Sequence, residues 1–431
     1  KTYSAARLIA QIIETHGTGV LAVAAPTGKA AVRITEAMHG YGVKIRATTI
    51  HGLLGVRHSG YEGWGFQHNA DNPLVCRFVV ADEASVIDTD LAASLFSACG
   101  TDTHLLLVGD IGQLPPVGHG APLRDLIAAG IPTGQLTETH RQAAASKVVQ
   151  ACGRIREGKQ FEVCDQINPE TGHNIKLLPA VKSETAIKKI IETIEAIGHR
   201  KIADPIWGCQ VIVAVNESSE LSRAVVNRRL QAGLKPRGTK VDCNPFRVGD
   251  KVVCSKNSFV QTCDPEEIDK YPRKIAKILI EDLERPEPKY NQGQKKVFVA
   301  NGEQGAVLEL EQKMTYVLLE APDRLVKIPR GTGAKDDDKE SATGCDWDLA
   351  YAISCHKSQG SEWPIVFVVL DDYGGAKMVC SREWLYTAPS RASTACFLVG
   401  KISTAYGMLS NVALQKRKTF LKERIRHEVE K

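Results

Sequence analysis

Two short apolar runs, each followed at once by polar residues, constrain the fold of this chain more than any other feature. The first run is residues 78–81 and leads into Asp82 and Glu83; the second is residues 105–108 and precedes Gln113. Runs of this length and composition are typical of buried strands in a parallel sheet. Because chemistry in open α/β sheets sits beyond the carboxyl ends of such strands, we expect these polar side chains to meet at one edge.

An acid pair at a strand end suits a hydrolase that acts on a nucleotide bound with Mg²⁺. Asp82 would lie near the metal and Glu83 would polarise the attacking water. The competing interpretation is that both carboxylates only solvate the end of the strand. Two further features decide between these interpretations: the second strand and the start of the chain.

The chain begins with Lys1 and Thr2, which run straight into a predicted helix. Lys-Thr at this position is the last part of a P-loop, in which the Lys reaches the β- and γ-phosphates and the Thr hydroxyl binds Mg²⁺. The glycines of a P-loop would have to precede Lys1, and position 1 is not Met. We therefore expect the numbering to start inside a longer protein.

Eight segments in order make the chain resemble a superfamily 1 helicase of the RecD-like branch. They are residues 1–2, 25–31, 48–51, 82–85, 109–117, 138–142, 352–362 and 385–392. The resemblance implies an α/β fold with two RecA-like P-loop motor domains built on parallel sheets. It also implies a hairpin insertion in the first motor domain and a small β-barrel insertion in the second.

The domain limits follow from this pattern and from the spacing of apolar residues. We expect the first motor domain at 1–145, with its hairpin at about 53–75, where aromatic residues alternate with glycines. The second motor domain would occupy 146–256 and 346–431. Short strands with Gly turns between these two parts predict the β-barrel insertion at 257–345.

The resemblance also implies an ATP and Mg²⁺ site between the two motor domains. Thr2 and Asp82 would bind the metal, and two groups of residues would act on the nucleotide. The catalytic residues would be Glu83, Gln113, Arg141 and Arg391; the nucleotide-binding residues would be Lys1, Thr2, Asp82, Gln359, Gly360 and Glu362. Arginines that arrive only when the domains close would couple hydrolysis to movement.

A second set of residues would contact single-stranded nucleic acid. It comprises Pro26, Thr27, Lys29, Thr49, His51, His356, Lys357 and Ser358. Phosphates can be bound by hydroxyl groups, by a Lys side chain and by N–H groups at helix N-termini. Such contacts do not recognise the bases. Thr27 could equally be a simple helix N-cap. In the hairpin, Trp64 or Phe66 could stack on a base or merely pack at the hairpin's foot.

Composition agrees with a globular protein and limits the partners. The hydrophobic content is 43% and the charged content 24%, and we expect no membrane span. The twelve cysteines form no Cys-x-x-Cys pair, which favours buried thiols in a reducing cytoplasm over a zinc site. The net charge of +5 comes entirely from residues 401–431, where 413–429 predicts a basic amphipathic helix whose polar face is solvated.

Together these features predict an ATP-dependent 5′ to 3′ translocase on single-stranded DNA and a DNA helicase that acts at duplex junctions. The 5′ to 3′ direction of translocation rests on the resemblance alone. A two-domain motor moves in the opposite direction if the other domain holds the strand during closure. An RNA helicase of the same superfamily is one alternative, since 2′-OH contacts are not visible in a sequence. A nucleotide-controlled binding clamp without strand separation is the other. Protein partners are unknown.

Overall fold

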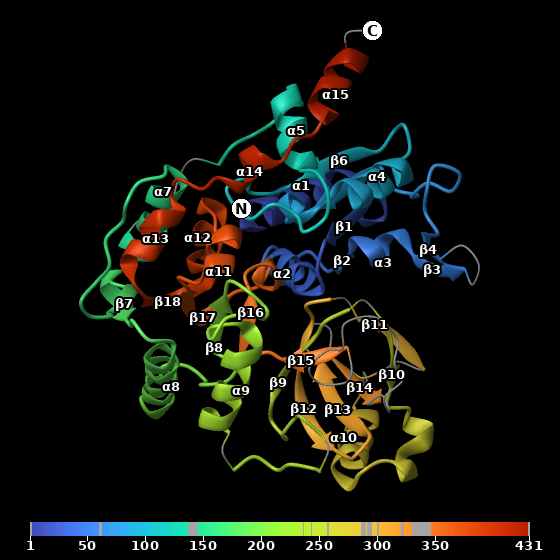
Figure 1. The fold of residues 1–431 in the computed structure, drawn as a ribbon. Helices are drawn as coiled ribbons and strands as arrows, with labels where there is room; N and C mark the ends of the chain where they lie inside the picture. Colours follow the sequence, from blue (N-terminus) through green and yellow to red (C-terminus); the bar gives the residue numbers. More distant parts are fainter. Residues whose placement is uncertain are drawn as a thin grey trace.

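The computed structural model describes residues 2–59, 63–136, 145–235, 237–242, 244–256, 258–285, 290, 295–299, 301–319, 323–329 and 346–429. Two predicted site residues, Lys1 and Arg141, lie outside these ranges. The backbone of Trp64 is described but its side chain is not. The described chain forms two parallel α/β sheets, a two-stranded antiparallel hairpin and a larger antiparallel sheet, which lies below the parallel sheets in Figure 1.

The first motor domain contains a four-stranded parallel sheet in the order β2-β1-β5-β6. Its strands are β1 (Leu21–Ala25), β2 (Thr48–Thr49), β5 (Phe78–Ala81) and β6 (His104–Leu107). The surrounding helices are α1 (Thr2–His16), η1 (Thr18–Val20), α2 (Gly28–His39), α3 (Ile50–Leu54), η2 (Ala84–Val86), α4 (Thr89–Ala98) and α5 (Pro122–Ala129). The predicted strand at 78–81 is confirmed, and the strand predicted at 105–108 begins and ends one residue earlier.

A two-stranded antiparallel hairpin leaves the first domain directly after α3. It consists of β3 (Val56–Ser59) and β4 (Gly63–Phe66), and it projects at the right-hand edge of Figure 1. The hairpin predicted between residues 53 and 75 is thus present. Phe66 lies at its foot, 5.8 Å from the ring of His51.

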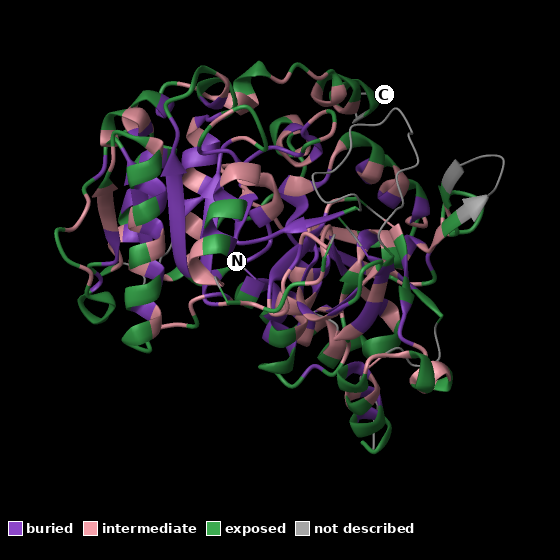
Figure 2. Ribbon diagram, turned by 60° about the horizontal axis from the view of Figure 1, so that its bottom comes forward, coloured by how far each residue is buried: buried purple, intermediate pink, exposed green. Residues whose placement is uncertain are grey.

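The second motor domain has a five-stranded parallel sheet in the order β16-β8-β17-β18-β7. Its strands are β7 (Ile175–Pro179), β8 (Cys209–Val213), β16 (Ala352–Ser354), β17 (Trp363–Leu370) and β18 (Ala392–Gly400). Its helices are α7 (Lys147–Arg156), η3 (Pro169–Thr171), α8 (Ser183–His199), α9 (Arg223–Leu234), η5 (His356–Ser358), α11 (Gly374–Val379), α12 (Arg382–Thr387), η6 (Pro389–Arg391) and α13 (Ile402–Met408). Strands β8, β17 and β18 are almost wholly buried, as the long apolar runs require (Figure 2).

The insertion in the second motor domain is a seven-stranded antiparallel sheet in the order β11-β10-β14-β13-β12-β9-β15. Its strands are β9 (Lys251–Cys254), β10 (Ser258–Thr262), β11 (Lys296–Val299), β12 (Gln304–Leu310), β13 (Met314–Leu319), β14 (Arg324–Pro329) and β15 (Trp347–Leu349). The order is linear, with β11 and β15 at its ends, so the described residues form a half-barrel and not the closed barrel that we expected. Strands β9 and β15 lie outside the predicted interval of 257–345.

Two helices pack with the half-barrel: η4 (Pro265–Lys270) and α10 (Arg273–Leu283). We did not predict α10, because the segment 264–296 is so rich in charge that its apolar positions are easily overlooked. Ile275 and Leu279, four residues apart, are nevertheless fully buried and belong to one core cluster. This spacing places both side chains on the same face of the helix.

A buried polar cluster joins the half-barrel to the second parallel sheet. Lys251 is 0% exposed, and its ammonium donates a 2.8 Å hydrogen bond to the Gln210 side chain. Next to it, Asp250 accepts hydrogen bonds from Tyr351 (2.8 Å) and Gln231 (2.6 Å). Buried polar groups are stable only when they are paired, so this joint favours one fixed arrangement of the two sheets.

The C-terminal segment returns to the first motor domain as α14 (Ala413–Lys416) and α15 (Leu421–Val429). The prediction of one continuous helix over 413–429 is wrong, because the chain is extended at Arg417. Helix α15 lies beside α5, as Figure 1 shows. Within the described ranges, none of the helices is long and apolar enough to cross a membrane.

Candidate functional site

A hydroxyl and a carboxylate meet where α1 begins and β5 ends. The Thr2 hydroxyl donates a hydrogen bond to Asp82 Oδ2 at 3.2 Å, and both residues are buried. Asp82 Oδ1 accepts the Glu83 N–H at 2.9 Å, which fixes the carboxylate plane. Small oxygen ligands of this kind are the ones that Mg²⁺ takes in nucleotide sites. The two residues predicted to bind the metal are therefore together.

Glu83 adopts a backbone conformation that non-glycine residues rarely adopt. Its φ is +53°, and its side chain is 5% exposed. A left-handed conformation of this kind costs on the order of 1–3 kcal/mol, and it persists where surrounding structure enforces it. Here the following N–H, that of Ala84, bonds to Val108 O at 2.8 Å. This conformation occurs directly after β5, at the same sheet edge as Asp82.

Gln113 is buried behind the end of β6, in the turn that follows the strand. Its Oε1 accepts no hydrogen bond from the residues that the structure describes, although the residue is only 6% exposed. The turn itself is held by Asp110, which accepts the Gly112 N–H at 2.9 Å and the Tyr386 hydroxyl at 2.7 Å. A buried amide oxygen without a donor is costly, so Gln113 is ready to accept from an added ligand or water.

Leu114, the residue after Gln113, forms hydrogen bonds with the second motor domain. The Leu114 N–H donates to Thr387 Oγ1, and Gln359 Nε2 donates to Leu114 O, both at 2.9 Å. The two main-chain polar atoms of Leu114 thus bond to two different segments of the second domain. Gln359 was predicted from the sequence to face the nucleotide, whereas the role of Thr387 was missed, although it lies inside the matching segment 385–392.

Arg391 is a buried cation close to the hydrogen bonds that connect Leu114 to the second domain. Its side chain is 3% exposed, and it donates to Thr387 O and to Ser390 Oγ, each at 3.2 Å. Among the described residues, no carboxylate lies within 4 Å of its guanidinium. Its charge opposes the effect of burial, which raises the pKa of the Cys152 and Cys355 thiols to about 12. A buried and uncompensated guanidinium favours the arrival of an anion.

Gly360 and Glu362 contact α2 of the first domain. Gly360 has φ +71°, and a Cβ built on it would lie 2.9 Å from Thr27 Oγ1. Glu362 forms an ion pair with Arg33. We expected both residues at the nucleotide; in the structure they join the two motor domains. Arg33 carries no sequence signal that would have identified this contact.

Three of the residues predicted to bind nucleic acid lie at helix starts. Thr27 Oγ1 accepts the Ala30 N–H at 3.3 Å and Thr49 Oγ1 accepts the Gly52 N–H at 2.9 Å, so both cap helices. The N-cap alternative for Thr27 is confirmed. Lys29 Nζ bonds to Gln304 Oε1 at 2.7 Å, and Pro26 beside it is half-buried. Lys29 therefore reaches the half-barrel from α2.

Two histidines of the predicted nucleic-acid set are partly buried and favour the neutral form. Burial lowers the pKa of His51, an effect that Asp88 partly opposes, and the ring stacks 6.3 Å from Phe298 of β11. Burial and then the charge of Arg417 lower the pKa of His356. Neutral imidazoles donate and accept hydrogen bonds without adding a charge to the surface.

Lys357 and Ser358 follow His356 in η5 but differ in access. Burial, followed by the charge of Arg223, lowers the pKa of Lys357, which remains half-buried. Ser358 is 0% exposed, and its hydroxyl donates to Cys355 O at 2.7 Å. The prediction that Ser358 faces nucleic acid does not agree with this burial, because the short η5 turn directs its side chain inward.

Comparison with protein families agrees with this geometry. The model of the AAA domain matches residues 1–171, and that of the UvrD-like helicase C-terminal domain matches 349–399. The ATP-dependent RecD2 DNA helicase of Deinococcus radiodurans is 29% identical over 97% of this chain and 48% of its own length. The RecD subunit of the RecBCD enzyme of Mycobacterium tuberculosis is 25% identical over 96% of this chain and 67% of its own length.

A solved structure is also similar. The Pif1 helicase from Bacteroides, in complex with ADP-AlF3 and single-stranded DNA, shares 17% identity, with a TM-score of 0.45. That match covers 100% of this chain and 91% of the Pif1 chain. The present chain spans about half the length of the Deinococcus relative.

Two parallel α/β sheets with a Thr-Asp-Glu site at the edge of the first define a two-domain P-loop motor protein. The two matching family models, an AAA domain followed by a UvrD-like helicase C-terminal domain, make this motor similar to the superfamily 1 helicases. Within that superfamily, the chain is similar to the RecD-like branch, which is the branch of the relatives that match it along nearly its whole length.

Proposed function

We propose that this chain is the motor of an ATP-dependent DNA helicase that moves 5′ to 3′ on single-stranded DNA. The observation that carries the proposal is the buried Arg391 guanidinium, which has no carboxylate within 4 Å among the described residues. It comes from the second domain and lies beside the joint at Leu114, one residue after Gln113 of the first. Such an arrangement suits a γ-phosphate shared between two domains.

Each site residue of the first motor domain has a distinct role in this proposal. Thr2 and Asp82 would hold Mg²⁺, which when bound neutralises phosphate charge and orients the β- and γ-oxygens. Glu83 would accept a hydrogen bond from the attacking water and take up its proton. The Gln113 amide oxygen would accept the water's other hydrogen, which satisfies an acceptor that is otherwise unpaired.

The joint at Leu114 would convert hydrolysis into movement. Because Gln359 and Thr387 bond to the residue next to Gln113, a change at the γ-phosphate is transmitted directly to the second domain. Thr27, Thr49 and His356 lie in segments that follow strand ends on both domains, where phosphates of a single strand would bind. Alternating grip by these segments would produce one step for each closure.

The test is a pair of duplexes with single-stranded tails of opposite polarity, incubated with ATP and Mg²⁺. We expect the 5′-tailed duplex to be unwound and the 3′-tailed duplex to remain intact. Preferential unwinding from the 3′ tail would refute the direction. Nucleic-acid-stimulated ATP hydrolysis without strand displacement would support the clamp, and stronger stimulation by RNA than by DNA of equal length would support an RNA substrate.

A further inference from the structure

The C-terminal segment, residues 413–429, bonds to both motor domains, and we call it the brace. At its start, the Glu383 carboxylate of the second domain accepts the N–H groups of Ala413 and Leu414 at 2.9 and 3.1 Å. Further along, Arg417 donates to the carbonyls of Gly118 and Gly120 in the first domain, each at 2.7 Å. The segment is thus held on both sides in a fixed position.

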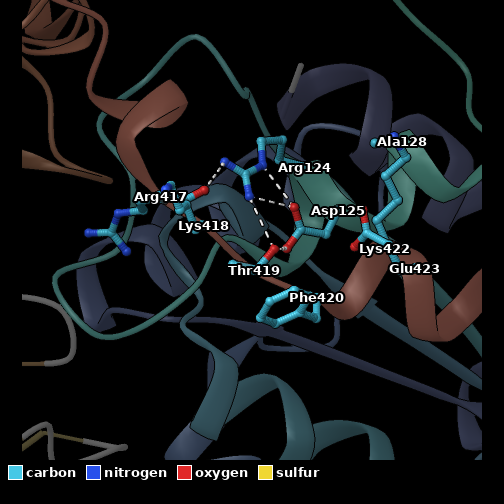
Figure 3. Close-up of a pocket in the computed structure, with 9 residues that line it drawn as sticks. All are labelled: Arg124, Asp125, Ala128, Arg417, Lys418, Thr419, Phe420, Lys422 and Glu423. Atoms are coloured by element: carbon cyan, nitrogen blue, oxygen red, sulfur yellow. Dashed lines mark hydrogen bonds and ion pairs between the residues drawn. The ribbon is translucent and has the colours of Figure 1, made fainter.

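A cavity of about 530 Å³ lies between this segment and α5 (Figure 3). One side is a closed network: Arg124 donates twice to Asp125 Oδ1, at 2.8 and 2.6 Å, and Thr419 donates to the other carboxylate oxygen. These bonds neutralise the charges of Arg124 and Asp125. They also fix the backbone on the N-terminal side of Phe420.

The rest of the cavity lining is cationic, with one exposed aromatic ring. Lys418 and Lys422 stand on either side of Phe420 in the sequence, whereas Glu423 is the one further acid in the lining. Neither ammonium forms an ion pair with any described residue. The Phe420 side chain is 78% exposed, although the neighbouring Thr419 is firmly bonded. The Phe420 ring is therefore exposed to water on a fixed backbone, with an unpaired lysine on either side of it in the sequence. Folding alone does not require this arrangement.

This combination matches the chemistry of one ligand class. Single strands are bound without sequence preference by cations that follow the phosphates and by aromatic rings on which bases stack. An acidic peptide would use the lysines but would have no flat group for the ring. Arg417 of the same segment bonds to the loop that follows Gln113, and its charge lowers the pKa of His356, one residue of the predicted nucleic-acid set.

We propose that Phe420, Lys418 and Lys422 form an additional binding site for single-stranded nucleic acid, with a base on the ring and its flanking phosphates on the two lysines. The inference rests on the proposed function, because it extends the track of the same strand beyond the residues at the helix starts. The site lies on a segment that bonds to both domains, so a strand bound there stays attached throughout a cycle of opening and closing.

The first experiment tests the ring. Binding of fluorescein-labelled oligodeoxythymidylates of increasing length is measured by anisotropy with wild type, Phe420→Trp, Phe420→Leu and Phe420→Ala. We expect Phe420→Ala and Phe420→Leu to weaken binding of long oligomers by roughly 5- to 150-fold, the range for one lost base–aromatic stack, and Phe420→Trp to retain it. Short oligomers that occupy only the other sites should bind all four proteins equally. Equal affinity for long oligomers across the series would refute the site.

The second experiment tests the lysines through the salt dependence of binding. Removal of two phosphate contacts by Lys418→Ala with Lys422→Ala should reduce the slope of log affinity against log salt by about 1.4, because each contact to a single strand contributes ~0.7. The matched control is Lys416→Ala with Lys377→Ala, which removes the same charge from exposed lysines outside the cavity lining. Identical slopes for the two double variants would overturn the assignment.

The two levels of the proposal fail in different ways. If the wild-type chain neither binds single strands nor hydrolyses ATP faster in their presence, the proposed function itself is wrong. If wild type does both and the Phe420 and lysine variants behave identically to it at every oligomer length, only the additional site is wrong. Unfolding temperatures of all variants should match that of wild type, because none of the three side chains takes part in the bonds among Arg124, Asp125 and Thr419.

Discussion

Gln359 Nε2 lies 2.9 Å from the main-chain oxygen of Leu114, and this hydrogen bond connects the second motor domain to the turn that carries Gln113. Both partners are buried, with 4% and 3% of their surfaces exposed. The bond therefore belongs to the interior of the domain interface. Its position one residue from a group predicted to touch water at the γ-phosphate makes it a route for coupling.

Gln359→Leu should weaken this coupling more than it weakens nucleotide binding. The substitution keeps the size of the side chain but leaves Leu114 O buried without that donor, at a cost of about 1–3 kcal/mol. We expect nucleic-acid stimulation of ATP hydrolysis to fall, while binding of a fluorescent ATP analogue changes little. Gln11→Leu, on the exposed face of α1, is the matched control. Unchanged stimulation in Gln359→Leu would rule out this route.

Gly360→Ala should separate the two domains at α2. The new methyl group would lie 2.9 Å from Thr27 Oγ1, and the residue would also have to keep a φ of +71°. Gly302 is a useful control, because its φ is +95° but a Cβ there meets nothing within 4 Å. Gly302→Ala therefore suffers only the backbone penalty of roughly 1–2 kcal/mol. We expect both variants to unfold at lower temperature but only Gly360→Ala to lose ATP turnover.

Glu83→Gln should retain ATP binding and lose at least ~10²-fold in turnover. That factor is the scale for removing a group that accepts a proton from the attacking water. The amide preserves the size of the side chain, so the strained backbone at φ +53° and the bond between Asp82 and the Glu83 N–H should survive. Turnover is measured at saturating ATP with single-stranded DNA present. A near-normal rate would remove Glu83 from the catalytic assignment.

Arg391→Ala should also lower turnover by at least ~10²-fold, since an arginine on the transferred phosphate is worth this much or more. Removing a buried charge that has no carboxylate partner should leave the unfolding temperature equal or higher. Arg324 is the contrasting control, because its guanidinium pairs with the buried Glu303. Arg324→Ala would leave that carboxylate buried without this partner. A large loss of stability in Arg391→Ala would indicate a structural role instead.

The strand β5 and the position of Asp82 and Glu83 at its end were readable from sequence because a local pattern specifies them. An apolar run of four residues followed by Asp82 and Glu83 has the length of a buried strand with the acids at its end. The spacing of Ile187, Ile190 and Ile194 predicts a helix over 182–197, and the structure has it as α8 (Ser183–His199), displaced by one or two residues at each end. The sequence also predicts a helix over 218–231; the structure has it as α9, which begins only at Arg223, and Ser218 has a positive φ that a helix excludes.

The features that were missed depend on contacts between segments far apart in the sequence. Nothing near Arg417 indicates that its side chain binds carbonyls of residues 118 and 120, which interrupts the C-terminal helix. Likewise, a Ser within a polar motif gives no sign that a single 3₁₀ turn will bury it, as happens at Ser358. The half-barrel strands β9 and β15 were assigned to the motor domain because their pairing partners are distant in sequence: β9 pairs with β12 inside the insertion and with β15 beyond it.

The last prediction concerns pH and links the C-terminal brace to the motor. Burial and the Arg417 charge both lower the pKa of His356 from 6.5, so the unfolded chain takes up this proton before the folded chain does as the pH falls. The stability linked to His356 is therefore complete above pH 6.5 and is lost as the pH drops through 6.5 towards the lower, folded-state pKa. Arg417→Gln removes one of the two causes, so it should raise this pKa part of the way towards 6.5.

The measurement is the titration of the His356 ring by NMR, supported by unfolding temperatures between pH 5 and 8, the range in which histidine titrates. His51 is an internal control, since its pKa is lowered by burial and opposed by Asp88, with no part played by Arg417. We expect Arg417→Gln to shift the His356 titration upward and to leave that of His51 in place. Equal shifts of both rings would mean that the substitution loosens the whole domain interface, and an unshifted His356 would mean that the charge of Arg417 does not reach it.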